Sequence, residues 1–288
     1  MTGDPLLSAV GALFGALIGS FLNVCISRLP AGLSVVRPRS RCPRCETPIA
    51  WHDNVPVVSW IALGGRCRSC HNRISPMYPL IELAVAALWG WMAWRHGLTV
   101  EALRWAMFGT LLIGIAMTDA REFIIPHEFS FGGILAGLLL AFGDGIGGVL
   151  AAVNGAIFGA GLVYLIGAAG EFAFKKEAMG GGDVAMMAMV GTFLDWQSVV
   201  ATIFAGAAVG IVLHLLSMVV RRPGPEPEPP RAPARAGDIE GMTNEELRAQ
   251  GYLPFGVSLA IAAGVLAFVV GVEAVNDWFA WYAGMIGL

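Results

Sequence analysis

The stretch Gly180-Gly181-Gly182-Asp183-Val184-Ala185-Met186-Met187-Ala188-Met189-Val190 places a carboxylate at the start of an apolar run. The three glycines leave the backbone free to adopt positive φ angles and allow another chain to approach closely. An ionisable residue at a membrane boundary is costly, so it is a candidate functional residue. Asp119 has a matching position, because it ends the apolar run 106–118. The sequence therefore offers two aspartates as a candidate pair.

The composition indicates a membrane protein that crosses the bilayer several times. The chain has 288 residues, of which 56% are hydrophobic and 14% are charged, whereas a soluble domain carries about 25% charged residues. Residues 1–5 lack the basic residues that begin a secretory signal, so we expect the first apolar run to be a membrane helix. The expected fold class is an all-α polytopic membrane protein.

Apolar runs predict about eight membrane helices. They lie near residues 6–27, 77–94, 102–118, 129–143, 146–170, 184–194, 196–220 and 253–272. A spanning helix needs about 20 residues, so the run 184–194 is short for this role. We keep it because omitting it would move five arginines of the segment 221–252 to the other side of the membrane.

Positive charges predict the orientation of these helices. If the first helix runs inward, every Lys and Arg except Arg95 and Arg104 falls on the cytoplasmic side. This arrangement places Asp119 and Asp183 together at the cytoplasmic ends of their helices. Two such aspartates could form a catalytic pair, or each could simply be solvated at a helix end.

We expect four regions along the chain. They are an N-terminal part, 1–95, with a cytoplasmic module at 28–78; a membrane core, 96–220; a Pro-rich linker with a short helix, 221–252; and a last helix with an interfacial aromatic tail, 253–288. The linker composition predicts an extended chain without a packed core.

Four cysteines in the module have the spacing of a zinc site. Cys42 and Cys45 form one C-x2-C pair, and Cys67 and Cys70 form another. Two such pairs can supply four thiolates to one structural zinc ion. A reducing cytosol argues against disulfides, and reduced cysteines without metal are the alternative.

An aspartate pair suits peptide hydrolysis. One carboxylate can activate water while the other, protonated, donates to the carbonyl oxygen, and close carboxylates share a proton because both cannot ionise together. The motif Gly180-x-Gly182-Asp183 is similar to the GxGD signature of intramembrane aspartyl proteases.

The wider sequence resembles the bacterial type IV prepilin peptidases. Besides the GxGD motif and the cysteine pairs, the resemblance is carried by Gly19-Ser20-Phe21-Leu22-Asn23-Val24, Arg28-Leu29-Pro30, Asp53-Asn54-Val55-Pro56-Val57-Val58-Ser59-Trp60, Ile74-Ser75-Pro76-Met77-Tyr78-Pro79-Leu80-Ile81-Glu82, Asp119 with Ile124-Ile125-Pro126, and Leu253-Pro254-Phe255-Gly256. Two positions depart from the family pattern: Ala185 stands where a lysine is usual, and His127 where an asparagine is usual.

The resemblance implies a function. It implies an inner-membrane enzyme of bacteria that cleaves the basic leader of prepilins or pseudopilins after a glycine at the cytoplasmic face. It also implies that the same protein often methylates the new N-terminus with S-adenosylmethionine. Asp119 and Asp183 would be catalytic, Gly180 and Gly182 would form the active-site loop, and lipid and prepilins would be the partners.

The sequence is also compatible with other residue roles and functions. Glu82 and His127 are possible auxiliary residues: Glu82 could pair with an arginine, line the substrate path or reach the interface, and His127 could tune Asp119 or be a solvated loop residue. The glycine-rich stretch 143–148 follows no strand, so no nucleotide or nucleic-acid site is expected. A carboxylate-based transporter or channel and a non-catalytic assembly subunit are the alternative functions.

Overall fold

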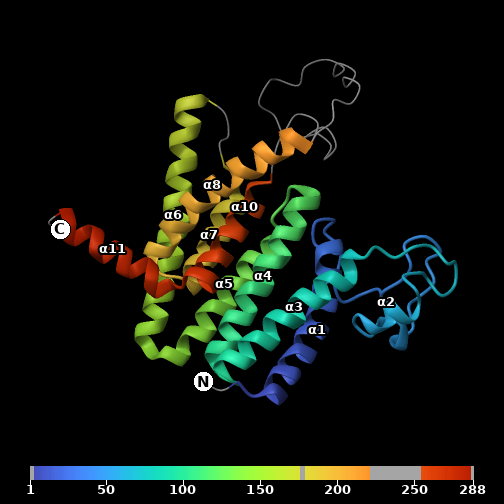
Figure 1. Cartoon of the computed structure of the whole chain (residues 1–288). Coiled ribbons are helices and arrows are strands. Elements are labelled where there is room, and N and C mark those ends of the chain that lie inside the picture. The colour runs from blue at the N-terminus through green and yellow to red at the C-terminus, as the bar shows by residue number, and fades with distance from the viewer. Residues whose placement is uncertain (1–2, 176–178, 221–253, 287–288) are drawn as a thin grey trace. The chain divides into compact units, whose positions relative to one another are not determined.

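The computed structural model describes residues 3–175, 179–220 and 254–286, and most of these residues are helical (Figure 1). Within these ranges the β-structure consists of two isolated bridges. The predicted all-α class is therefore confirmed. The predicted linker and short helix at 221–252 lie outside the described residues.

The described part of the chain folds into long and short helices. They are α1 (Pro5–Arg28), the 3-10 helix η1 (Trp51–Asn54), α2 (Val58–Ala62), α3 (Met77–His96), α4 (Val100–Glu122), α5 (His127–Ala141), the 3-10 helix η2 (Phe142–Asp144), α6 (Gly145–Phe174), α7 (Gly181–Phe193), α8 (Trp196–Val220), α10 (Phe255–Val265), the π-helical turn η3 (Leu266–Val270) and α11 (Val272–Ile286).

Two compact units make up the chain, Met1–Gly114 and Ile115–Leu288, and the boundary between them falls within α4. We call them unit 1 and unit 2. In unit 1, α1 and α3 pack as an antiparallel pair through glycines. A Cβ built at Gly15 would lie 2.6 Å from the carbonyl oxygen of Val85, so only glycine allows this approach. Small residues that bring backbones together are typical of helix pairs in membranes.

In unit 2, α7 is the central helix. Its residues Met186 to Phe193 are buried, and it contacts α5, α6, α8 and α10. A helix that is apolar on all sides and short is stable only when other helices surround it. The closest approach is between α6 and α7, where a Cβ at Gly155 would overlap the carbonyl oxygen of Gly191.

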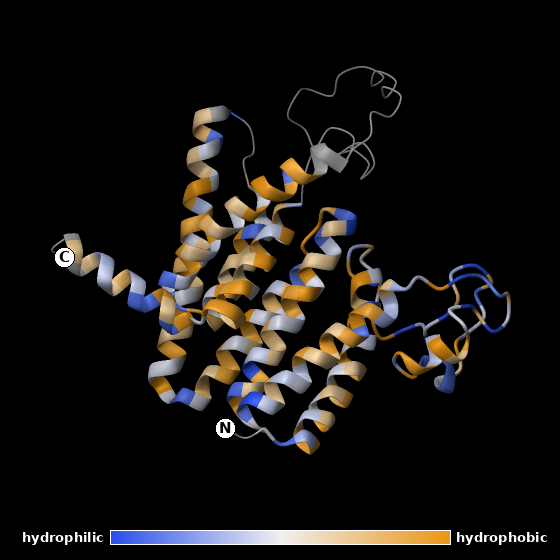
Figure 2. Ribbon diagram, viewed as in Figure 1, coloured by the Kyte–Doolittle hydropathy of each residue, from blue (hydrophilic) through white to orange (hydrophobic). Residues whose placement is uncertain are grey.

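Helix lengths agree with a multi-pass membrane protein. Five stretches are long and apolar enough to cross a bilayer: Pro5–Arg28, Met77–His96, Val100–Glu122, His127–Ala173 and Trp196–Leu216. The fourth contains both α5 and α6, between which the chain reverses direction at η2 (Figure 1). Figure 2 shows that hydrophobic residues predominate along these helices. Each of the eight predicted runs corresponds to a helix, and their number as complete spans stays a prediction.

The C-terminal part bends sharply. Phe255–Val270 and Val272–Ala283 meet at 90°, and Gly271 between them has a φ of 86° that favours glycine. Trp278, Trp281 and Tyr282 on α11 are exposed, which fits the predicted role of an aromatic anchor at the membrane interface.

The contact between α6 and α7 gives a first testable prediction. Gly155→Ala should lower the free energy of unfolding by about 1–3 kcal/mol, because the added methyl group forces the two backbones apart. Gly161→Ala on the same helix is the control. A Cβ there meets nothing within 4 Å, and alanine favours the helix over glycine by roughly 0.5–1 kcal/mol. Thermal unfolding in detergent should show a lower midpoint for Gly155→Ala alone, and equal midpoints would contradict this packing.

Candidate functional site

Asp119 lies in the last turn of α4 and is 5% exposed. Its Oδ2 accepts a hydrogen bond of 2.9 Å from the backbone N–H of Val257, and the N–H of Gly256 also interacts with this carboxyl group. Both groups belong to the first turn of α10, whose own N-cap Pro254 makes no side-chain hydrogen bond. The first N–H groups of a helix lack partners within the helix. Asp119 therefore caps α10 from another helix.

Asp183 lies in the first turn of α7 and is half-buried. Its backbone N–H donates to the carbonyl oxygen of Gly180, the N-cap residue, over 3.1 Å. An acidic side chain in the first turn interacts favourably with the partial positive charge of the helix N-terminus. A Cβ at Gly180 would lie 3.8 Å from Asp183 Oδ2, so residue 180 borders the carboxylate.

The two carboxyl groups lie close enough to interact electrostatically. They come from the C-terminal end of α4 and the N-terminal end of α7, both within unit 2. Like charges disfavour simultaneous ionisation when they are close. The structure thus brings together the two aspartates that the sequence offered as a pair.

Ile125 joins the segments that carry the aspartates. A Cβ at Gly182 would lie 3.1 Å from Ile125 Cβ, and a Cβ at Gly256 would lie 2.8 Å from Ile125 Cδ1. The same Cβ at Gly256 would also lie 2.8 Å from Asp119 Oδ2. Glycine at 182 and 256 therefore permits the close approach of three segments around the pair.

The sequence interpretation did not assign roles to these neighbours of the pair. Ile125 and Gly256 belong to stretches that carried the resemblance, but their contact with Asp119 could not be inferred from motifs far apart in the chain. The only available signal was that a glycine directly follows Pro254-Phe255 at the start of an apolar run.

The two auxiliary candidates have other environments. Glu82 is 8% exposed, and its Oε2 accepts a 2.7 Å hydrogen bond from the backbone N–H of Val57 within unit 1. Val57 has a φ of 60° and a ψ of −50°, an unusual conformation for a β-branched residue. Glu82 therefore stabilises a strained turn. His127 is exposed at the start of α5 and stacks on Phe131 with ring centroids 5.5 Å apart.

The four cysteine sulfurs of the module converge. All four lie within 4.8 Å of one another, and Cys42 Sγ and Cys70 Sγ are 3.7 Å apart. Four thiolates bound to zinc at about 2.3 Å in a tetrahedron would be separated by about 3.8 Å. The sulfurs are thus placed as a four-thiolate zinc site requires.

Both cysteine pairs have the same backbone structure. The N–H of Cys42 donates to Thr47 and that of Cys67 to Asn72, and the carbonyls of the same cysteines accept from Glu46 and His71. Glu46 and His71 also share a positive φ, 56° and 55°. Each pair is therefore one copy of a turn that points two sulfurs toward a common centre.

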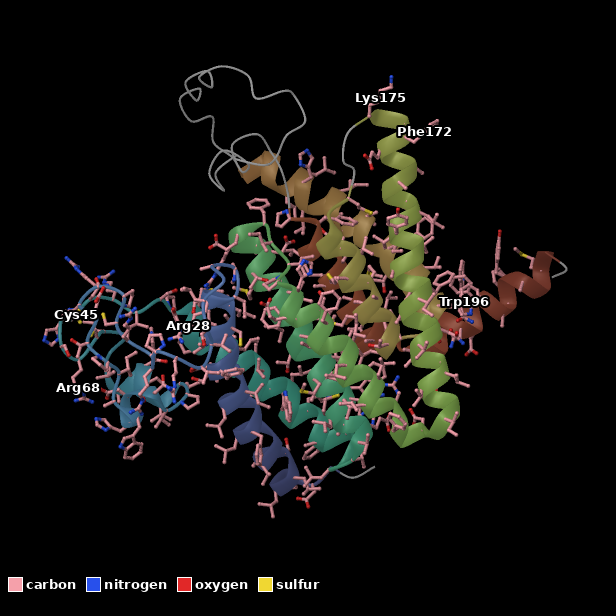
Figure 3. The ribbon with its side chains drawn as sticks, turned by 180° about the vertical axis from the view of Figure 1, so that it is seen from behind. Arg28, Cys45, Arg68, Phe172, Lys175 and Trp196 are labelled. Carbon is pink, nitrogen blue, oxygen red and sulfur yellow. The ribbon has the colours of Figure 1, made fainter. Side chains whose placement is uncertain are left out.

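Polar contacts stabilise the module, part of which is labelled in Figure 3. Arg68 Nε and Nη2 donate to the two carboxylate oxygens of Asp53 over 2.7 and 2.6 Å, a bidentate ion pair. These hydrogen bonds lower the pKa of Asp53. Hydrogen bonding with Thr47 lowers the pKa of the Cys45 thiol to about 6, whereas desolvation and hydrogen bonds with the other cysteines raise the pKa of Cys70 to about 11.

Two neighbouring aspartates at helix ends, in a bundle of apolar helices and beside a Gly-x-Gly turn, are the arrangement expected of a membrane aspartyl peptidase. Comparison with known families agrees. Residues 13–96 match the model of the Bacterial Peptidase A24 N-terminal domain, and residues 106–215 match that of the Type IV leader peptidase family.

Curated relatives extend this result. The chain is 38% identical over 225 residues to a prepilin leader peptidase/N-methyltransferase of Myxococcus xanthus, covering 78% of this chain and 67% of that protein. Proteins of the same name from Pseudomonas aeruginosa and Neisseria gonorrhoeae are 34% and 30% identical, covering 73% and 76% of this chain and 80% and 85% of their own lengths. The chain therefore belongs to the prepilin leader peptidase/N-methyltransferase family. No solved structure matches it.

The contact between Gly256 and Asp119 predicts a large effect of a small substitution. Gly256→Ala should lower peptidase activity about 100-fold, because the methyl group displaces the Asp119 carboxylate and a shift of about 1 Å can cost that much. Gly132→Ala in α5, where a Cβ meets nothing within 4 Å, should retain activity. Both rates are measured on purified protein of equal zinc content. Near wild-type activity of Gly256→Ala would show that the close approach is not needed.

The cysteine geometry predicts the metal content. Purified protein should contain about one zinc per chain, since four thiolates complete one tetrahedral site. Cys42→Ser combined with Cys67→Ser should remove it, whereas Cys25→Ser, remote in sequence from the cluster, should not. Elemental analysis with protein quantification provides the test. A zinc-free wild-type protein of unchanged stability would contradict a structural zinc site.

Proposed function

We propose that this protein is a membrane aspartyl endopeptidase that removes the leader peptide from type IV prepilins and pseudopilins. The observation that carries the proposal is the meeting of Asp119 and Asp183 where one helix ends and two others begin. The family membership and the names of its relatives support the substrate class.

Hydrolysis by this pair follows from the chemistry of two carboxyl groups. The ionised one removes a proton from water as the water oxygen bonds to the scissile carbonyl carbon. The protonated one gives its proton to the carbonyl oxygen, which forms a tetrahedral intermediate. When the C–N bond breaks, a carboxyl group returns a proton to the leaving nitrogen. Asp119 and Asp183 thus alternate as base and acid.

Neighbouring backbone groups hold the two aspartates in a fixed orientation. The N–H of Val257 fixes one oxygen of Asp119, and the first turn of α7 fixes the position of Asp183. Glycine at 180 leaves no side chain beside the Asp183 carboxylate, where a substrate backbone could approach, and glycine at 182 allows the close contact with Ile125. A fixed geometry of this kind reduces the entropy that must be lost in the transition state.

The metal and the methyl donor have separate roles in the proposal. Cys42, Cys45, Cys67 and Cys70 would hold zinc, which would fill its four positions with thiolates and so stabilise the module without taking part in hydrolysis. Methylation of the new N-terminus with S-adenosylmethionine is supported by the names of the relatives. The cavity between α1 and residues 35–40 does not fit this donor, because its lining contains no carboxylate for the sulfonium and ammonium groups.

The proposed location is the bacterial inner membrane, with the aspartates and the module on the cytoplasmic side. The distribution of Lys and Arg supports this orientation. In intact cells, a thiol reagent that cannot cross membranes should label Asp144→Cys and should not label Arg235→Cys, in a background in which Cys25 is replaced. The reverse labelling would place the aspartates on the opposite side.

The catalytic pair itself is tested by substitution. Asp119→Asn and Asp183→Asn should each abolish nearly all cleavage of a tagged prepilin, and the double variant should be little worse, because groups that act as a unit are not additive. The dependence of the rate on pH should be bell-shaped, since one carboxyl must be protonated while the other is ionised.

Asp144→Asn, in the exposed turn η2, is the control and should remain active. Asp195 is a poorer control, because its substitution would also remove structural hydrogen bonds. Its carboxylate caps α8 through the N–H of Ser198 and also accepts from Asn276. A correctly inserted Asp183→Asn enzyme that cleaves prepilin at the wild-type rate would exclude the proposed mechanism.

A further inference from the structure

A cavity of about 340 Å³ lies in unit 1. It is bordered by one face of α1, by the segment 35–40 that leads to the first cysteine pair, and by residues 54 and 56 before α2. Pockets for small molecules have volumes of about 300–1,000 Å³. We call this cavity the α1 groove. None of its lining residues belongs to unit 2, so the two aspartates do not contribute to it.

The α1 groove is apolar along the helix and cationic at the helix end. Leu17, Phe21 and Val24 are spaced along one face of α1, and Leu17 and Phe21 are 53% and 54% exposed. Arg28 lies at the end of α1 (Figure 3), and Arg39 belongs to the lining segment 35–40. Because no acidic residue lines the groove, its positive charge is not compensated from within.

The length of the α1 groove suits an acyl chain. Leu17 and Arg28 are separated by about 16 Å along the axis at 1.5 Å per residue, roughly half of the ~30 Å hydrocarbon layer. The α1 helix is one of the stretches long enough to cross the membrane. A ligand that fills the groove therefore has an apolar part at membrane depth and an anionic part at the surface.

The two arginines are available for an anion. Arg28 Nη1 donates to the carbonyl oxygen of Ser34 over 3.0 Å, which orients the guanidinium and leaves its other N–H groups for a ligand. Arg39 is exposed, and no hydrogen bond or ion pair of its side chain occurs among the described residues. Guanidinium groups bind phosphate oxygens in a bidentate manner, so the two arginines suit a ligand that carries a phosphate.

The module beside the α1 groove also exposes apolar side chains. Val36, Trp51, Val58 and Ile61 are 78%, 76%, 62% and 66% exposed. Val58 and Ile61 lie one turn apart on α2, and exposed apolar residues of this size are typical of a surface that contacts another apolar phase. This second observation indicates that the module lies against lipid, as the position of the groove requires.

We propose that the α1 groove binds one anionic glycerophospholipid. Its phosphate lies between Arg28 and Arg39, and an acyl chain follows Leu17, Phe21 and Val24. Because Arg39 precedes Cys42 by three residues, the bound lipid ties the start of the cysteine module to the end of α1. An anionic lipid of the cytoplasmic leaflet has the required charge and location.

Native mass spectrometry of the delipidated, full-length protein in detergent tests the proposal. Phosphatidylglycerol should form one saturable adduct, and phosphatidylethanolamine with the same acyl chains should bind several-fold more weakly. Arg28→Gln with Arg39→Gln should weaken phosphatidylglycerol binding about 25-fold, or about fivefold for each arginine. Arg37→Gln with Arg66→Gln, two arginines outside the lining, is the control of equal charge and should bind as the wild type does.

Two further measurements test the contributions of the acyl chain and of the phosphate separately. Ser20→Trp, in the middle of the groove, should remove the adduct while both arginines remain, because the indole ring fills the path of the acyl chain. Glycerol phosphate in large excess should compete weakly, since it lacks the chain. Zinc content and melting temperature show that each variant is folded. If the double variant is unfolded, Arg39→Gln alone, at an exposed position, should still weaken binding about fivefold.

Several outcomes would overturn the proposal. They are equal binding of the two lipids, equal loss of binding in the control pair, unchanged binding in Ser20→Trp, and full competition by glycerol phosphate. Displacement of the lipid by S-adenosylmethionine, with the same dependence on Arg28 and Arg39, would assign the groove to the methyl donor instead.

Discussion

The hydrogen bond from the Val257 N–H to the Asp119 carboxylate joins residues 138 positions apart in the chain. In a membrane a backbone N–H without a partner is costly, and the first N–H groups of α10 have none within their own helix. Asp119 supplies that partner, so one side chain in the last turn of α4 caps α10 and also takes part in the proposed catalysis. A substitution there removes a structural contact together with a functional group, and loss of activity alone would not separate the two.

Glycines allow the helices of unit 2 to pack closely around this carboxylate. α7 has only 13 residues, and its buried methionines and valine are enclosed by longer helices. Gly155 and Gly191 bring α6 and α7 into backbone contact. Gly182 and Gly256 allow their segments to pack closely against the side chain of Ile125. A larger residue at 182 or 256 would shift the start of α7 or of α10, which carry Asp183 and the hydrogen-bond donor to Asp119.

The main features of the fold could be predicted because they depend on local composition. Apolar runs located the helices, the cysteine spacing located a cluster of four sulfurs, and two aspartates at the ends of apolar runs predicted a pair. The capping of α10 by Asp119 could not be predicted, because it depends on which helix ends meet in space. The contact of Glu82 with the strained Val57 was missed for the same reason, since a buried glutamate near a helix start suggests an ion pair as readily as a backbone acceptor.

Local signals were also overlooked. Arg41-Cys42-x-x-Cys45 and Arg66-Cys67-x-x-Cys70, each followed four residues later by an isoleucine, are an internal repeat with a period of 25 residues. Their shared turn geometry makes each copy a rigid bidentate chelator. A metal held by one copy would meet the second at a high effective concentration, because the chain between them is short. Release would then require both halves to detach together, so the module would exchange metal slowly even where each half alone binds it weakly.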